Sequence, residues 1–452
     1  MSAINETRRR VAPSLRLGLY RALSNVLSPA VPYWLDLRVK RGKEDPARLN
    51  ERLGSTDRQR PDGPLVWIHG ASVGESLSAL PIIDRLQSRF SGVSVLVTTG
   101  TLTSARLLSQ LLPEGAFHQF VPLDTPRAVK RFLNHWRPDV ALFMESELWP
   151  NLILRTAERG IPMALLNARM SQGSFNRWLK ARGPAKVMLG AFDLCLAQDT
   201  DIVGRLESLG ARNVSIIGNL KYAAPPLSFD DHALEMLQDM MRGRRIWLAS
   251  CTHDGEERIA GHVHATLKES YPEAMTLLVP RHPARGPEIA NLLADMGHKV
   301  ALRSRGETVT PKTDIYVADT LGELGLFYRA ADIAFIGATL VPKGGHNPLE
   351  AARLNCAILY GPHTDNNITI YRELAAAGAA IQVVGRDQLA REVASLFADP
   401  AKVARMAEAG ARVCVKADSV IGRTMSAVEP LIACALEPSL APDSEAPIRA
   451  RA

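Results

Sequence analysis

Cysteine is scarce in this chain: the five residues stand far apart and form no C-x-x-C pair. Their odd number and wide spacing argue against a disulfide framework and against a zinc ribbon. The chain also lacks G-x-x-x-x-G-K-[ST], G-x-G-x-x-G and H-E-x-x-H, which disfavours P-loop hydrolysis, dinucleotide redox chemistry and zinc catalysis. We expect reduced thiols in a cytosolic protein at Cys195, Cys251, Cys356, Cys414 and Cys434.

One D-x-D motif occurs, Asp199-Thr200-Asp201, and it follows a short apolar run. Asp199 stands where an N-cap would begin the next helix, so we favour helix capping over metal binding. Metal binding at this pair is the alternative interpretation.

Positive charge is concentrated near the N-terminus. Residues 1 to 60 hold 13 Lys and Arg against 6 Asp and Glu, a surplus that equals the whole net charge of +7. The uncharged stretch from Ala22 to Leu35 contains Pro29 and Pro32 and is too short for a bilayer span of roughly 20 residues. This pattern favours a shallow membrane-associating arm on an anionic surface, and argues against a nucleic-acid-binding body. A solvated basic tail is the alternative.

Short apolar runs alternate with amphipathic stretches of helical length through both halves of the chain. This pattern predicts an α/β protein with two doubly wound, Rossmann-like domains facing a central cleft. The expected strands are 65–68, 93–98, 140–144, 163–166, 194–196, 215–217, 246–248, 277–279, 333–336 and 358–360. The expected regions are an arm (1–45), a first domain (46–222), a linker crossed once (223–243), a second domain (244–436) and a disordered tail (437–452).

In the first half, polar residues follow the expected strands, where ligands of open α/β sheets bind. Glu75 opens a helix after His69 and suits either a general base or a cap on the helix dipole. Glu145 follows a buried strand and needs a partner, for which Lys221 is the candidate.

In the second half, the corresponding loops favour phosphate and nucleotide binding. Arg281 follows a strand and suits bidentate phosphate binding. Gly344 and Gly345 precede an expected helix with Asn347 as N-cap and Pro348 as first residue. The carboxylate of Glu350 in its first turn suits ribose hydroxyls or the helix dipole.

Six ordered motifs resemble a known family: His69–Glu75, Met144–Asn151, Asn167–Arg169, Gly218–Lys221, Val279–Pro283 and Gly344–Glu350. Together they strongly resemble 3-deoxy-D-manno-octulosonic acid (Kdo) transferases, over about residues 40 to 430. The resemblance implies the two-domain glycosyltransferase-B (GT-B) architecture. It also implies inverting transfer of Kdo from CMP-Kdo to the lipid A precursor, without an active-site metal or other cofactor, at the cytoplasmic face of the inner membrane.

By matched position, the resemblance makes Glu75 the general base and Glu145 with Lys221 the groups that stabilise the transition state. The first domain would then bind the acceptor. The implied CMP contacts in the second domain are Pro280, Arg281, Leu321, Gly322, Glu323, Asn347, Pro348, Leu349 and Glu350. A related GT-B enzyme using another nucleotide sugar, either a UDP-sugar transferase or an epimerase, is the main alternative, and a non-catalytic lipid-binding protein is a further one.

Overall fold

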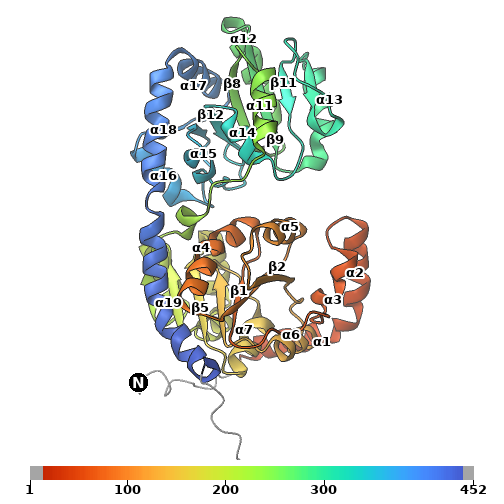
Figure 1. The fold of residues 1–452 in the computed structure, drawn as a ribbon, viewed down its shortest axis with the longest axis vertical. Helices are drawn as coiled ribbons and strands as arrows, with labels where there is room; N and C mark the ends of the chain where they lie inside the picture. Colours follow the sequence, from red (N-terminus) through yellow and green to blue (C-terminus); the bar gives the residue numbers. More distant parts are fainter. Residues whose placement is uncertain (1–13, 441–452) are drawn as a thin grey trace, which may run out of the picture. The chain divides into compact units, whose positions relative to one another are not determined.

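The computed structural model of the protein describes residues 14–440. Two compact units are present: one runs up to Ala224 and resumes at Ala417, and the other is Pro225–Lys416. Each contains a parallel seven-stranded sheet flanked by helices, which confirms the predicted fold class of two doubly wound α/β domains (Figure 1). Their arrangement about a cleft stays a prediction.

The first sheet reverses its strand order between β1 and β4. Its strands, in spatial order, are β3 (Ala116–Phe120), β2 (Ser94–Thr99), β1 (Leu65–His69), β4 (Val140–Met144), β5 (Met163–Ala168), β6 (Leu194–Ala197) and β7 (Val214–Ile216). Residues 65–69 and 140–144 are completely buried in the sheet, as expected for central parallel strands.

The second sheet follows the same plan and reverses between β8 and β12. Its spatial order is β10 (Val300–Leu302), β11 (Ile315–Val317), β9 (Ala274–Pro280), β8 (Arg245–Thr252), β12 (Ile333–Ile336), β13 (Ala357–Tyr360) and β14 (Ala380–Gln382). Every strand that the sequence predicts is present, and β3, β10, β11 and β14 are additional. The additional strands lie toward the sheet edges.

Helices connect most successive strands in both units, whereas β10 and β11 are joined by a 3-10 turn and a loop. The helices of the first unit are α1 (Leu15–Val26), α2 (Val31–Lys40), α3 (Leu49–Arg52), α4 (Val73–Arg89), α5 (Leu102–Leu111), α6 (Pro126–Trp136), α7 (Pro150–Glu158), α8 (Gln172–Lys180), α9 (Arg182–Leu189), α10 (Thr200–Ser208) and α19 (Ala417–Leu440). Those of the second unit are α11 (Asp231–Met240), α12 (Glu256–Ser270), α13 (Gly286–Asp295), α14 (Leu324–Arg329), α15 (Leu349–Arg353), α16 (Ile368–Ala376), α17 (Arg386–Ala398) and α18 (Pro400–Cys414). Short 3-10 turns are η1 (Ser28–Ala30), η2 (Pro46–Arg48), η3 (Leu220–Ala223), η4 (Pro283–Arg285) and η5 (Arg303–Arg305).

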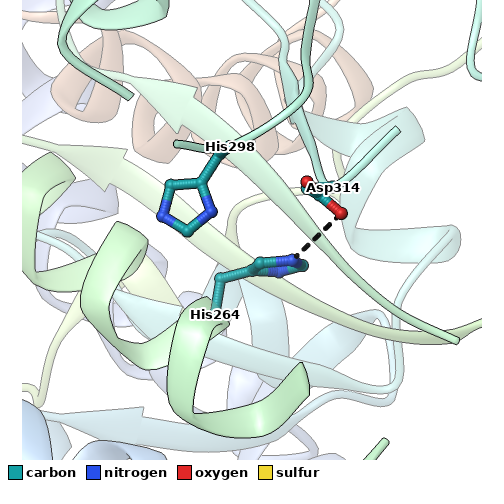
Figure 2. A group of neighbouring side chains, drawn as sticks. All are labelled: His264, His298 and Asp314. Carbon is teal, nitrogen blue, oxygen red and sulfur yellow. Dashed lines mark ion pairs between the residues drawn. The ribbon is translucent and has the colours of Figure 1, made fainter. Parts of the chain in front are cut away.

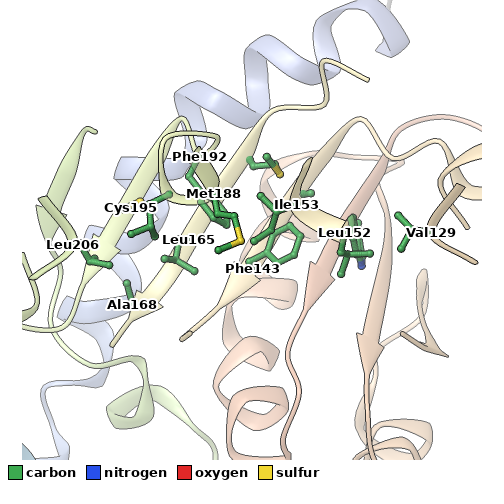
Figure 3. Packing of buried hydrophobic residues seen from close by; sticks show 14 of the residues in the cluster. Val129, Phe143, Leu152, Ile153, Leu165, Ala168, Met188, Phe192, Cys195 and Leu206 are labelled. Atoms are coloured by element: carbon green, nitrogen blue, oxygen red, sulfur yellow. The ribbon is translucent and has the colours of Figure 1, made fainter. Parts of the chain in front are cut away.

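The core of the first unit forms where helices pack on the sheet. Phe143 of β4 and Leu165 of β5 meet Ile153 of α7 and Met188 of α9 (Figure 3). Each of these side chains is at most 1% exposed. Such close packing fixes the carboxyl ends of β4 and β5, from which site residues project.

The predicted single crossing between domains is wrong, because α19 returns to the first unit. Val428, Ile432 and Leu436 of α19 are fully buried, and Arg423 donates a hydrogen bond to the Ile217 carbonyl at 3.0 Å. The predicted linker is also partly wrong, since α11 belongs to the second unit and contacts α14. Of the predicted disordered tail, residues 437–440 end α19, while 441–452 lie outside the described residues.

One helical stretch of the described chain, Pro400–Leu436, is long and apolar enough to cross a membrane by length and composition alone. The mean hydropathy of its qualifying 18-residue window is 1.2, and 39% of that window is buried within the protein. Helix α19, the second part of this stretch, packs against α4, η3 and β4.

The N-terminal arm is folded from residue 15 onward. Its helix α1 contacts α6, and Leu17 and Leu35 are buried, 6% and 1% exposed. Further apolar side chains of the arm remain exposed: Leu15, Leu19, Leu23, Val26, Leu27, Tyr33 and Trp34. The arm therefore combines a face packed on the first unit with an apolar face in contact with solvent.

Candidate active site

Glu75 lies at the carboxyl end of β1, beside the reversal of the first sheet. Ser72 is the N-cap of α4: its hydroxyl donates to Glu75 Oε1 at 2.7 Å, and the Ala71 N–H donates to Glu75 Oε2 at 2.8 Å. A Cβ at Gly70 would lie 3.1 Å from the Glu75 Cβ. The tight turn therefore places the carboxylate at the sheet edge where ligands bind.

The surroundings of Glu75 favour its protonated form. Its side chain is only 8% exposed. Burial raises the pKa of Glu75 to about 7 and the charge of Glu145 adds to the rise, while hydrogen bonds from Ser72 and Ala71 oppose it. A carboxyl group that titrates near neutral pH is matched to a general base. Glu75 therefore both takes part in capping α4 and has a pKa that suits a general base.

Glu145 follows β4 with a left-handed backbone, φ 55°, which is rare outside glycine. Its carboxylate meets two cations: Lys221 Nζ lies 3.3 Å from Oε1 and Arg169 Nη1 lies 3.5 Å from Oε2. The sequence predicted Lys221 as its partner, and the structure confirms that pair. Arginine and lysine side chains placed side by side suit the binding of an anionic substrate group.

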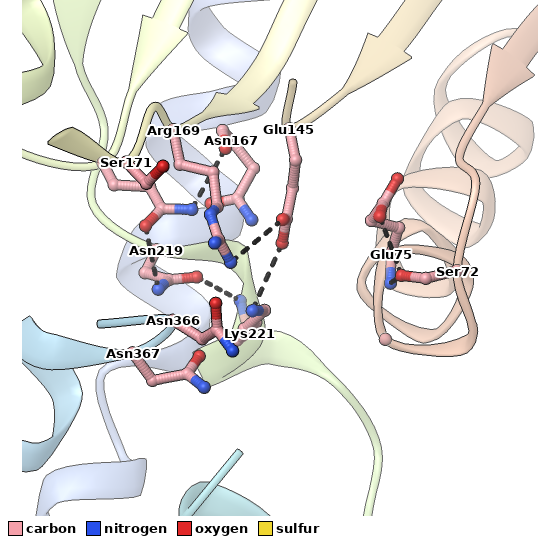
Figure 4. A network of polar contacts seen from close by, with 12 residues as sticks. Ser72, Glu75, Glu145, Asn167, Arg169, Ser171, Asn219, Lys221, Asn366 and Asn367 are labelled. Atoms are coloured by element: carbon pink, nitrogen blue, oxygen red, sulfur yellow. Dashed lines mark hydrogen bonds and ion pairs between the residues drawn. The ribbon is translucent and has the colours of Figure 1, made fainter. Parts of the chain in front are cut away.

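The Lys221 segment is held in place by amide side chains (Figure 4). Asn167, also at positive φ, accepts the Leu220 N–H on Oδ1 at 2.9 Å, and Asn219 accepts the Lys221 N–H at 3.0 Å. Arg169 follows Asn167 by two residues. Figure 4 shows Glu145 with Glu75 on one side and Lys221 and Arg169 on the other. The structure thus groups all three predicted catalytic residues within the first unit.

A buried acid organises the corresponding loops of the second unit. Glu256, the first residue of α12, accepts backbone hydrogen bonds from His253, Ala338, Thr339 and Leu340 at 2.9, 2.7, 3.1 and 3.0 Å. It thereby joins the loop after β8 to the loop after β12. These two strands flank the reversal of the second sheet, so the acid shapes the expected binding edge.

Nitrogen-bearing side chains gather at this edge. His253 Nε2 lies 3.1 Å from His346 Nε2, their rings stack, and His282 meets His253 edge-on. Burial, together with the charges of Arg281 and His253, lowers the pKa of His346 to about 3. Arg281 and Lys343 lie near these histidines, and such a group of nitrogen donors suits a phosphate.

The other predicted nucleotide contacts lie in the loops after β9 and β11. Pro280 ends β9, and the Arg281 N–H donates to the Thr252 carbonyl at 2.9 Å. Leu321 is 59% exposed and Gly322 has φ 85°.

Glu323 ends the β11 loop at the N-cap position of α14 and is already paired. Arg303 donates to it through Nε at 2.6 Å, and hydrogen bonding by Arg303 lowers the pKa of Glu323.

The glycine-turn helix begins one residue later than predicted. Helix α15 starts at Leu349, and Pro348 takes the N-cap position in a helical conformation. The Asn347 Oδ1 nevertheless accepts the Leu349 N–H at 3.2 Å, as a capping side chain does, and its Nδ2 lies 3.5 Å from Glu350 Oε1. Glu350 stands in the first turn, as predicted.

Comparisons with known proteins agree with these motifs. A family model described as 3-deoxy-D-manno-octulosonic-acid transferase (kdotransferase) matches residues 47–224. A probable mitochondrial 3-deoxy-D-manno-octulosonic acid transferase of Arabidopsis thaliana is 38% identical, over 84% of this chain and 88% of the relative. The Haemophilus influenzae 3-deoxy-D-manno-octulosonic acid transferase is 33% identical, over 91% of this chain and 98% of its own.

The chain belongs to the Kdo transferase family. As a Kdo transferase family member it is a glycosyltransferase. A glycosyltransferase structure from Rickettsia africae has a TM-score of 0.56 at 13% identity, covering 84% of this chain and 100% of that one. At that identity the likeness concerns the fold, and it agrees with the GT-B architecture of two Rossmann-like units.

Sequence reasoning missed three features of this Kdo transferase site. Arg169 is the last residue of the Asn167–Arg169 motif, but nothing in the neighbouring sequence indicated that it contacts Glu145. Glu256 and the His253–His346 contact join segments far apart in sequence, so no local spacing reveals them. By contrast, Asp199 accepts the Ile202 N–H at 2.9 Å and caps α10, which confirms the capping interpretation.

Proposed function

We propose that the protein transfers Kdo from CMP-Kdo to the lipid A precursor, with inversion at the anomeric carbon and without an active-site metal. The observation that carries this proposal is the environment of Glu75. Its carboxyl group has a pKa of about 7 and lies near Glu145, which contacts Lys221 and Arg169. Membership of the Kdo transferase family supports the sugar.

The reaction is a single displacement. An acceptor hydroxyl oxygen forms a bond to the anomeric carbon as the bond from that carbon to the CMP phosphate oxygen breaks. Glu75 takes the hydroxyl proton, and CMP leaves with the electron pair of the broken bond. Because the attacking and leaving oxygens lie on opposite faces of the carbon, one displacement inverts its configuration.

Kdo carries a carboxylate, and the two cations beside Glu145 suit such an anion. Lys221 and Arg169 both contact the Glu145 carboxylate. We assign them to the negative charge of the sugar carboxylate or the departing phosphate, with Glu145 holding both cations in position.

The CMP moiety is assigned to the second unit. Arg281 lies beside the histidine cluster, and its guanidinium together with the ring nitrogens suits the CMP phosphate. Pro280 and the loop Leu321, Gly322 and Glu323 are assigned to the nucleobase. The segment Asn347, Pro348, Leu349 and Glu350 is assigned to the ribose, whose hydroxyls would donate to the Glu350 carboxylate.

The N-terminal arm is assigned to the cytoplasmic face of the inner membrane, either as a peripheral contact or as a single anchor. Leu19 and Leu23 are 60% and 53% exposed, and Lys40, Arg41 and Lys43 are also exposed. Exposed apolar side chains beside basic ones are typical of interfacial segments that bind anionic lipids. A phosphorylated lipid acceptor would meet the enzyme at that surface.

Donor discrimination tests this proposal. The purified protein is incubated with CMP-Kdo or with a UDP-sugar, each with and without the lipid A precursor, and the released nucleotide is measured. We expect CMP release that depends on the lipid, and an inverted anomeric configuration by NMR of the product. Lipid-dependent release of UDP would favour the UDP-sugar alternative, and retention of configuration would contradict the single displacement.

A further inference from the structure

A second group of metal-ligand side chains lies at the amino ends of strands in the second unit. His264 projects from α12, His298 precedes β10, and Asp314 immediately precedes β11 (Figure 2). The predicted nucleotide contacts follow the carboxyl ends of strands in the same parallel sheet. The group is therefore separate from the candidate nucleotide site.

Two imidazole nitrogens in this group are buried without a hydrogen-bond partner. The His264 side chain is fully buried; its Nδ1 lies 3.0 Å from the Thr276 hydroxyl, while Nε2 has no hydrogen bond. His298 Nε2 is also buried and lacks one. Burial of a polar atom without a partner is unfavourable, so each such atom in a folded protein calls for an explanation.

An ion pair with Asp314 does not explain the buried nitrogens. The distance from His264 Nε2 to Asp314 Oδ1 is 3.7 Å, too long for a hydrogen bond. Burial lowers the pKa of His264 to about 4, against the opposing charge of Asp314. Burial also lowers the pKa of His298, although the charge of Asp314 and a hydrogen bond to the Gly261 backbone act to raise that pKa.

We propose that His264 Nε2, His298 Nε2 and Asp314 Oδ1 bind a divalent transition metal ion of the zinc class. One ligand atom from each residue lies within 4.8 Å of the others. Ligands about 2.0–2.1 Å from a tetrahedral zinc ion are about 3.4 Å apart. The 3.7 Å separation of His264 and Asp314 therefore needs only a small contraction.

The surroundings support ligation through these atoms. His264 Nδ1 lies 3.0 Å from the Thr276 hydroxyl, and the tautomer that carries its proton on Nδ1 donates to Thr276 and presents the Nε2 lone pair. Metal-bound histidines in proteins usually donate their other ring N–H to such a partner. Asp314 Oδ2 accepts the Lys299 N–H at 2.8 Å, which fixes the carboxylate.

One cation competes for the carboxylate. Lys268 Nζ contacts Asp314 Oδ1, the oxygen assigned to the metal. The Lys268 side chain is 42% exposed, so it can move into solvent or share the oxygen through a second lone pair. The bound ion would join α12 to the loops before β10 and β11, a stabilising role distinct from catalysis.

Metal titration of the full-length protein tests the proposal after removal of bound ions with a chelator. We expect wild type to bind one equivalent of Zn²⁺ in competition with a chromophoric chelator. His298→Gln should bind at least 100-fold more weakly, since loss of a second-shell partner alone costs 10–100-fold. His232→Gln, an exposed histidine on α11, is the matched control and should bind as wild type does.

Thermal unfolding gives a second readout. Zn²⁺ should raise the melting temperature of wild type by several degrees and leave His298→Gln unchanged, because an ion stabilises only the state that binds it. Asp314→Asn is the second variant if His298→Gln does not fold. Absence of saturable binding by wild type, or equal affinity in wild type and either ligand variant, would overturn the proposal. Co²⁺ spectra with thiolate charge-transfer bands would also overturn it, since they would place the ion at cysteine.

Discussion

Replacement of Glu75 by Gln should lower turnover while raising stability at alkaline pH. Burial and Glu145 raise the pKa of Glu75 to about 7 from 4.5. A difference of about 2.5 units corresponds to about 3 kcal/mol of unfavourable ionisation in the folded state above pH 7. Glutamine removes that cost but cannot accept the hydrogen bonds of both Ala71 and Ser72, a loss of about 1 kcal/mol. The net gain is about 2 kcal/mol.

The sign of this effect depends on pH. Below pH 4.5 the carboxyl group is protonated in both states, so its raised pKa carries no cost. Between pH 4.5 and 7 the folded state binds more protons than the unfolded state, and the contribution of Glu75 to stability falls as pH rises. Glu75→Gln should therefore be more stable than wild type at pH 8, and equal or slightly less stable at pH 4.

Turnover should respond in the opposite direction. Removal of a general base lowers the rate by a factor of about 10²–10⁴, so we expect a loss of at least two orders of magnitude with CMP affinity retained. Urea midpoints at pH 8 and pH 4 and steady-state rates are measured for Glu75→Gln and for Glu207→Gln, an exposed control on α10. Near-normal turnover together with lower stability at pH 8 would show that Glu75 is only a helix cap.

Further predictions concern the charge beside Glu75, the donor site, metal dependence and the arm. Glu145→Gln should move the acidic limb of the rate profile to lower pH, because the Glu145 charge raises the pKa of Glu75; an unmoved limb would contradict this. Arg281→Ala should weaken CMP binding by about 10–100-fold, the worth of a charged hydrogen bond, measured by calorimetry with exposed Arg258→Ala as control. Turnover should persist in chelator, and loss that Mg²⁺ restores would reinstate an active-site metal. Leu23→Glu should reduce co-sedimentation with anionic vesicles, whereas Val384→Glu, a control that is 77% exposed in wild type, should not.

The buried strands were predictable because central parallel strands are continuous apolar runs. Val140–Met144 is such a run, whereas the apolar run of β3 (Ala116–Phe120) is interrupted by His118 and Gln119, and β10 and β11 have three residues each. The return of α19 to the first unit was not predictable, since an amphipathic helix shows that it packs but not on which domain.

The residues of the candidate site were likewise predictable where the local sequence marks them, and not where only the fold brings them together. Glu75 and Glu145 were found because each follows a buried strand, where an acid stands out. Arg169 and Glu256 were not, because their contacts depend on the twist and register of the sheets rather than on spacing in the chain. His264, His298 and Asp314 are likewise brought together only by packing of α12 against the sheet.

The transfer of Kdo to lipid with Glu75 as the base is tested by mass analysis of the acceptor lipid after incubation with CMP-Kdo. We expect wild type to add Kdo to the lipid A precursor, and Glu75→Gln, at equal protein and donor concentrations, to add at least 100-fold less per unit time. An unmodified lipid with wild type, or equal modification by both proteins, would contradict it.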